Sequence, residues 1–98
     1  MLPVATRRAN ADLHEAALAA RVRVLGPEHP DTLTSRSNLA NGYRAVGRHD
    51  EAITLDEETL AALVRVLGPE HPDTLASRGN LAGGYWACLL YTSDAPDE

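Results

Sequence analysis

The 98-residue sequence has one cysteine, one tryptophan, no phenylalanine and no apolar run of the length that a membrane helix needs, roughly 20 residues. A single cysteine excludes an internal disulfide framework and leaves no cysteine cluster for zinc. Without phenylalanine, the core has to be built mainly from Leu, Val and Ala, which suits close-packed helices. We therefore expect a small soluble protein that makes no membrane contact.

Positive charge is also scarce. The nine basic residues are all arginines, they face fourteen acidic residues, and the net charge is −5. No basic run is longer than Arg7-Arg8, so we predict that nucleic acid is not a partner. The opening residues, MLPVATRR, contain no apolar segment of signal-peptide length, and we expect a cytoplasmic protein.

The sequence does contain a long internal repeat. The string RVLGPEHPDTL runs from Arg23 to Leu33 and again from Arg65 to Leu75, an offset of 42 residues. When residues 22–45 are laid over residues 64–87, only four pairs differ: Thr34/Ala76, Ser37/Gly79, Asn41/Gly83 and Arg44/Trp86. A weaker third copy precedes them. Repeats of this kind are stacked units that bury their apolar faces against one another, so the sequence predicts a solenoid.

The repeated string contains signals that end one helix and begin the next. Gly26 can adopt the positive φ that ends a helix, and Pro27 cannot continue it. Pro30 suits a first helical turn, and Asp31 complements the helix dipole there. The second copy carries the same signals at Gly68, Pro69, Pro72 and Asp73. Each string therefore predicts a connector between two helices.

Between the connectors, apolar residues recur at helical spacing. The pattern predicts helices near residues 11–25, 30–46, 50–67 and 72–87 of an all-α fold, arranged as antiparallel helix hairpins. Residues 1–10 lack a recognisable leading helix and are interpreted as a degenerate or truncated leading segment, so the repeat region spans residues 11–87.

The run NLANGYRAVGRHDEA, from Asn38 to Ala52, resembles the tetratricopeptide repeat, with signature residues at Leu39, Ala40, Tyr43 and Ala52. The 42-residue period and the LGPEHPDTL connector are similar to the kinesin-light-chain-like variety. Departures from the pattern are Arg36 and Arg78, where the family often has an aromatic residue, and Asp56, where Tyr or Phe is usual. The resemblance implies a short right-handed α-solenoid that acts as an interaction scaffold.

The last eleven residues, CLLYTSDAPDE from Cys88 to Glu98, break the repeat. They resemble the conceptual translation of a sequencing adapter, whose usual reading differs only at Pro96. We interpret residues 88–98 as a non-native tail; the alternative is a natural frayed C-terminus. Both ends look cut from a longer array, so we expect a fragment of a multi-repeat protein that can self-associate through its truncated repeat ends.

Clusters that could carry chemistry have simpler structural interpretations. His29 and His71 lie one repeat apart with no Cys or second His at metal-ligand spacing, so they are expected to serve the connectors. The serines lack a nucleophile motif, and Asp50 and Glu51 suit a helix start better than a catalytic pair. Cys88 has no activating neighbour. We predict no enzymatic activity, cofactor or metal.

The resemblance implies that the first helix of each repeat lines a concave groove that binds protein or peptide. The residues at matching positions, our predicted peptide-binding set, are Thr34, Ser37, Asn38, Asn41, Arg44, Asn80 and Trp86. The amide side chains of Asn38 and Asn80 can pair with an extended peptide backbone, and Arg44 can pair with a carboxylate. The alternative for each Asn is a hydrogen bond to the neighbouring helix.

Two functions remain open at this point. The first is a scaffold that binds an extended peptide on its concave face. The alternative is a set of structural spacer repeats with no ligand of their own. All four differences between the two copies fall on the predicted binding face, which favours the scaffold.

Overall fold

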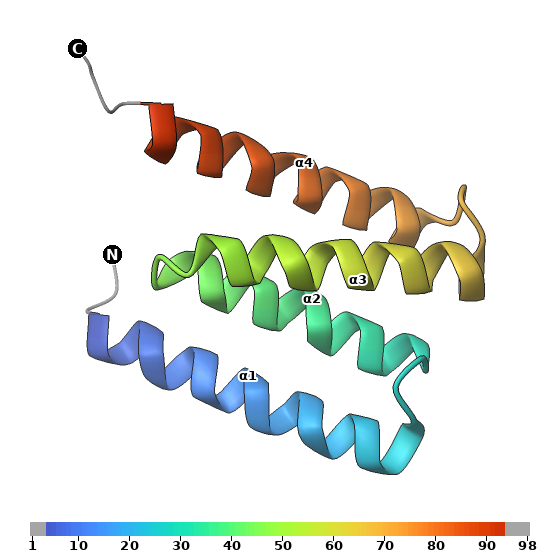
Figure 1. Cartoon of the computed structure of the whole chain (residues 1–98). Helices are drawn as coiled ribbons and strands as arrows, with labels where there is room; N and C mark the ends of the chain where they lie inside the picture. Colours follow the sequence, from blue (N-terminus) through green and yellow to red (C-terminus); the bar gives the residue numbers. More distant parts are fainter. Residues whose placement is uncertain (1–3, 94–98) are drawn as a thin grey trace.

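The computed structural model describes residues 4–93, which form four helices: α1 (Val4–Leu25), α2 (Pro30–Ala45), α3 (His49–Leu67) and α4 (Pro72–Ser93). Each helix packs against the next one in the sequence and runs antiparallel to it (Figure 1). Since the described residues contain no strand, the predicted all-α fold of helix hairpins is confirmed. The result is an elongated array measuring 47 × 31 × 19 Å.

The first helix starts earlier than the sequence pattern predicted. It begins at Val4, inside the segment interpreted as lacking a helix, rather than near residue 11. From Val4 to Asn10 the sequence contains neither Pro nor Gly and is rich in Ala and Arg, which are strong helix formers. Helix propensity therefore extends α1 beyond the region where the repeat match is visible.

The last helix also runs further than predicted. It continues to Ser93 instead of ending near residue 87, so the first half of the segment interpreted as a tail is helical. In the preceding copy, Gly47 has a φ of 85° and lies in the turn after α2. The equivalent position in α4 is Leu89, which gives the helix no reason to stop. Residues 94–98 of the predicted tail lie outside the described residues.

The two connectors have the predicted structure. Gly26 and Gly68 have φ values of 91° and 94°, in the region that favours glycine. The histidines contribute the helix cap: Nδ1 of His29 accepts a 3.1 Å hydrogen bond from the Asp31 amide, and His71 repeats this bond at 3.0 Å with Asp73. The recurring Glu-His-Pro sequence is therefore explained by capping of the following helix.

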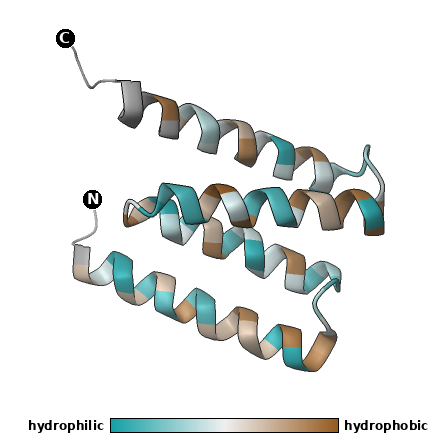
Figure 2. Cartoon of the chain, in the orientation of Figure 1, coloured by the Kyte–Doolittle hydropathy of each residue, from teal (hydrophilic) through white to brown (hydrophobic). Residues whose placement is uncertain are grey.

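The core is small and consists mainly of Leu and Ala, as the shortage of aromatic residues predicted. Leu33 of α2 forms a buried cluster with Ala62 and Leu63 of α3, and Leu67 packs against this cluster. Figure 2 shows apolar residues spaced along all four helices with polar residues between them. Such spacing leaves one side of each helix available to the solvent.

Two kinds of hydrogen bond recur with the 42-residue period and join consecutive helices. The Thr32 hydroxyl donates to the Arg21 carbonyl at 3.4 Å, and Thr74 donates to Leu63 at 3.5 Å. Likewise, Tyr43 donates a 2.7 Å hydrogen bond to the Glu15 carboxylate. The equivalent pair is Tyr85 with Glu57. The repeat therefore specifies the contacts between helices as well as the helices themselves.

Candidate peptide-binding surface

The predicted binding residues of α2 gather on one exposed side of that helix. At 3.6 residues per turn, positions 34, 37, 38, 41 and 44 fall on a single face. Thr34, Asn38 and Asn41 are exposed, whereas Ser37 and Arg44 are partly buried. The five positions taken from the family resemblance therefore share one side of α2, and their role in binding stays a prediction.

The equivalent side of α4 is similarly open. Gly79 and Gly83 are exposed, Asn80 is half-buried, and the Trp86 side chain is 61% exposed. We use the name Asn face for the predicted residues on these two helices: Thr34, Ser37, Asn38, Asn41, Arg44, Asn80 and Trp86. The exposed Trp86 ring offers an apolar contact to a partner, and the asparagine amides offer polar contacts.

Asn38 and Asn80 have unused hydrogen-bonding groups. Among residues 4–93, the side chain of neither asparagine makes a hydrogen bond to another residue. The alternative interpretation, in which each asparagine bonds the neighbouring helix, is therefore not what the described residues show. Each side chain keeps a donor and an acceptor available at equivalent positions one repeat apart.

Arg44, by contrast, is fully engaged within the chain. Its Nη1 lies 2.5 Å from Oδ2 of Asp56, whose side chain is only 1% exposed, and its Nη2 donates to Asn41. The same guanidinium lies against α4, where a Cβ at Gly84 would be 3.4 Å from Nη1. Arg44 thus pairs with an internal carboxylate, and the predicted pairing with a peptide carboxylate stays a prediction.

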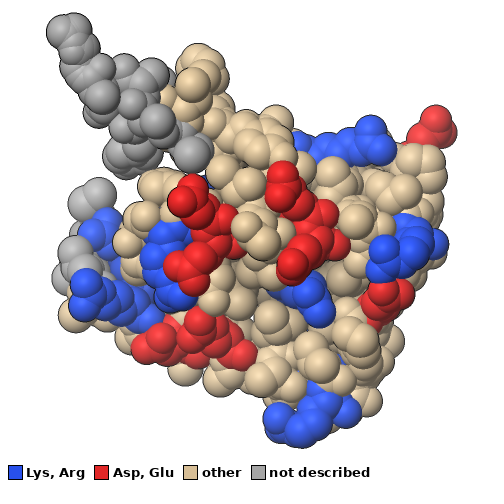
Figure 3. All heavy atoms as spheres, viewed as in Figure 1, with Lys and Arg blue, Asp and Glu red and all other residues tan. Residues whose placement is uncertain are grey.

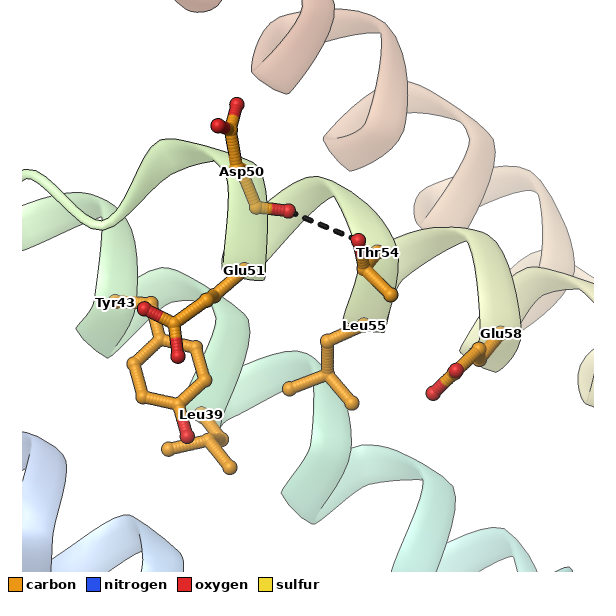
Figure 4. A pocket seen from close by; sticks show the side chains of 7 residues that line it. All are labelled: Leu39, Tyr43, Asp50, Glu51, Thr54, Leu55 and Glu58. Carbon is orange, nitrogen blue, oxygen red and sulfur yellow. Dashed lines mark hydrogen bonds between the residues drawn. The ribbon is translucent and has the colours of Figure 1, made fainter.

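A hollow of about 360 Å³ lies between α2 and α3, on the side of α2 opposite the Asn face. Its residues are Leu39, Tyr43, Asp50, Glu51, Thr54, Leu55 and Glu58. In Figure 4, Leu55 points toward Leu39, and the Glu51 carboxylate lies over the Tyr43 ring. Acidic side chains also gather over α3 in Figure 3. An apolar floor with an acidic rim has the chemistry to accept a basic side chain with an aliphatic stem.

The rim of this hollow is held in place by a small network. Arg48 donates two hydrogen bonds to Glu51, at 2.7 and 2.6 Å, and its guanidinium lies 4.2 Å from the centre of the Tyr43 ring. The hydrogen bonds from Arg48 lower the pKa of Glu51. Burial, together with the hydrogen bond to Glu15, raises the pKa of Tyr43 above its ordinary value. Glu51 is therefore ionised and Tyr43 neutral near pH 7.

A sequence model of the family described as Tetratricopeptide repeat matches residues 7–31 and 32–73, more than half of the chain. The chain belongs to the tetratricopeptide repeat family. Tetratricopeptide repeats generally serve as scaffolds for protein–protein interactions, so the predicted fold and the general role are confirmed. The second match covers all of α3 and all but the first two residues of α2, and the first match covers most of α1 and the connector that follows it.

The kinesin-light-chain-like character is also confirmed. Protein kinesin light chain-related 2 of Arabidopsis thaliana is 51% identical over 45 residues, which cover 46% of this chain and 7% of that protein. The chain therefore corresponds to a small part of the length of this relative. No solved structure matches the chain.

Two further findings concern the described part of this tetratricopeptide array. Within residues 4–93, no group of three or more His, Cys, Asp or Glu side chains is placed to hold a metal ion. No helix there is both long and apolar enough to cross a membrane.

The sequence interpretation overlooked the Tyr–Glu pairs and the hollow behind α2. The signal for the pairs was present, since Glu15 recurs as Glu57 just as Tyr43 recurs as Tyr85. The hollow left no comparable signal, because its residues come from two helices and share no sequence motif.

Proposed function

We propose that this tetratricopeptide array binds an extended peptide across the Asn face. The observation that carries the proposal is the pair Asn38 and Asn80, which occupy equivalent positions on α2 and α4 and make no side-chain hydrogen bond within residues 4–93. A bound peptide has backbone N–H and C=O groups that need partners, and a side-chain amide supplies both a donor and an acceptor.

Variation between the two copies supports the same surface. The connectors are identical, whereas the four differing pairs, at positions 34/76, 37/79, 41/83 and 44/86, lie on the side of α2 and α4 that carries the Asn face. With constant amides and variable neighbours, the surface would hold the peptide backbone in both repeats and select different side chains in each. Trp86 provides an apolar contact in the second repeat, and Arg44 positions Asn41 in the first.

The proposal can be tested with peptides selected from a random library against the folded 98-residue chain. Isothermal titration calorimetry would then compare the parent with an Asn38→Ala, Asn80→Ala double variant. The double variant should keep its helicity and lose about 0.5 to 1.5 kcal/mol of binding free energy for each net hydrogen bond removed. The matched control is Asn10→Ala, an exposed asparagine on α1, which should leave affinity unchanged.

Two outcomes would contradict the proposal. If the double variant binds as tightly as the parent, the Asn face is not the binding surface. If a diverse library yields no peptide that binds the folded chain, the spacer function is favoured instead.

A further inference from the structure

The hollow between α2 and α3 stays open although both helices are packed on two sides. Helix α2 packs against α1 and α3, and α3 packs against α2 and α4. About 360 Å³ nevertheless remains beside Leu39 of α2 and Leu55 of α3, on the side of α2 opposite the Asn face. Because the floor is apolar, a group bound there removes apolar surface from water.

Two glutamates line the α3 edge of this hollow. At 3.6 residues per turn, positions 51, 55 and 58 share one side of α3. In Figure 4, Leu55 lies between Glu51 and Glu58 along the helix, whereas the Asp50 carboxylate points away from the leucines. A ligand lying over Leu55 therefore has a carboxylate within reach in either direction along α3.

The two glutamates differ in what they already bind. Glu51 accepts both hydrogen bonds of Arg48. Among the described residues, the Glu58 carboxylate has no hydrogen-bond or salt-bridge partner. No basic residue stands three or four positions from Glu58, where a salt bridge within the helix would form. Glu58 is therefore the carboxylate of the hollow that is available to a cation from outside the chain.

Arg48 shows which kind of cation suits this surface. Its guanidinium donates to both carboxylate oxygens of Glu51, at 2.7 and 2.6 Å, and lies 4.2 Å from the centre of the Tyr43 ring. A planar guanidinium matches a carboxylate with two parallel N–H donors, and its weak hydration favours contact with apolar side chains. Glu58 offers the same carboxylate about 10 Å further along α3, beside leucines.

A purely structural role explains the other acidic residues better than it explains Glu58. Asp50 and Glu51 lie in the first turn of α3, where negative charge complements the helix dipole. Glu58 lies beyond the reach of that effect. Leu55 recurs as Leu13 at the equivalent position of α1, but Ala16 stands at the position of Glu58. The apolar floor is therefore part of the repeat, whereas the free carboxylate is not required by it.

We propose that the hollow binds an arginine side chain presented by a partner protein. The aliphatic stem would lie over Leu39 and Leu55, and the guanidinium would donate to Glu58. Charge selects this partner, because an acidic side chain would be repelled by the same carboxylate and a neutral one would gain no ion pair. Since the Asn face lies on the opposite side of α2, the two surfaces can be occupied independently.

Nuclear magnetic resonance titration of the folded 98-residue chain with N-acetyl-arginine amide tests the chemistry of the site. The methyl signals of Leu39 and Leu55 should shift and reach saturation. N-acetyl-citrulline amide, which has the same length but no charge, should bind more weakly, as should N-acetyl-lysine amide, whose ammonium lacks the planar fork. The proposal is overturned if these methyl signals do not respond, or if citrulline or lysine binds as tightly as arginine.

A variant that removes only the charge of Glu58 gives a second test. Glu58→Gln should weaken binding of N-acetyl-arginine amide about 2- to 5-fold, the range expected for an exposed ion pair. The matched control is Glu70→Gln, which removes the same charge from an exposed position in the connector before α4 and should bind like the parent. Because both glutamates are exposed, circular dichroism should show parental helicity. Equal affinity in both variants would mean that the hollow does not select arginine.

The Asn38→Ala, Asn80→Ala variant separates this site from the Asn face. It should bind N-acetyl-arginine amide with parental affinity, whatever its effect on selected peptides. If the double variant loses arginine binding while Glu58→Gln keeps it, the arginine binds at the Asn face and the assignment to the hollow is wrong.

Discussion

Arg44 and Asp56 form an ion pair between α2 and α3, with Nη1 and Oδ2 2.5 Å apart. The Asp56 carboxylate is almost completely buried, and within the described residues its other oxygen has no hydrogen-bond partner. Asp56 thus depends on Arg44 alone for compensation of its charge. This residue stands where tetratricopeptide repeats usually have an aromatic side chain, so an ion pair replaces aromatic packing at this point of the repeat.

Removing one partner of this ion pair should lower the free energy of unfolding more than removing both partners. Arg44→Ala is expected to lower the free energy of unfolding by about 3 kcal/mol, because it leaves a buried carboxylate without its cation. Arg44→Leu combined with Asp56→Leu should recover most of that loss, since no charge is then buried. Chemical denaturation of the three proteins measures the difference. Equal losses in the single and double variants would show that Asp56 does not depend on Arg44.

The repeated tyrosines should contribute unequally to stability. Tyr43 is partly buried and donates to Glu15, so Tyr43→Phe should cost about 1 kcal/mol of unfolding free energy. Tyr85 is exposed, and Tyr85→Phe should cost less, because water can replace the Glu57 carboxylate. Thermal or urea unfolding compares the two variants with the parent. A larger loss from Tyr85→Phe than from Tyr43→Phe would contradict this account.

The free energy of unfolding should fall at alkaline pH because the Tyr43 phenol ionises. Burial and the Glu15 hydrogen bond favour the neutral phenol, so its pKa in the folded chain lies above the ordinary value of 10.0. The stability that Tyr43 contributes is fully present below about pH 10 and is lost as the pH rises through the folded-state pKa. Urea unfolding from pH 8 upward should show a smaller alkaline loss for Tyr43→Phe than for the parent. Identical pH profiles would mean that the pKa of Tyr43 is the same in the folded and the unfolded chain.

The capping histidines provide a test of the connector. His29→Ala should lower the free energy of unfolding by about 0.5 to 1 kcal/mol, because the Asp31 amide loses the acceptor that caps α2. His29→Asn should restore most of the stability, since asparagine is a strong N-cap residue. His71 should behave in the same way at the start of α4. If asparagine is no better than alanine at position 29, the imidazole does not act as a cap.

How far the sequence predicted this structure depends on how local each signal is. Gly26, His29 and Pro30 act within a few residues of themselves, so the connectors and the helices that they separate were predicted correctly. The binding positions on α2 came from the resemblance to the tetratricopeptide repeat, and their role in binding stays a prediction. The pairing of Arg44 with Asp56 could not be predicted in this way, because it depends on how two helices pack. The end of α4 was missed because the repeat was expected to stop, although Leu89 replaces the glycine that would stop it.

Packing of each helix against its neighbours in sequence has a consequence for how the chain folds. Contacts between consecutive helices span short sequence separations, so the relative contact order is low and folding is expected on a timescale of microseconds to milliseconds. The outer helices, α1 and α4, are each held on one side, whereas α2 and α3 are held on two. Amide hydrogen exchange should therefore be slowest in α2 and α3, with the array opening from its ends toward this central hairpin.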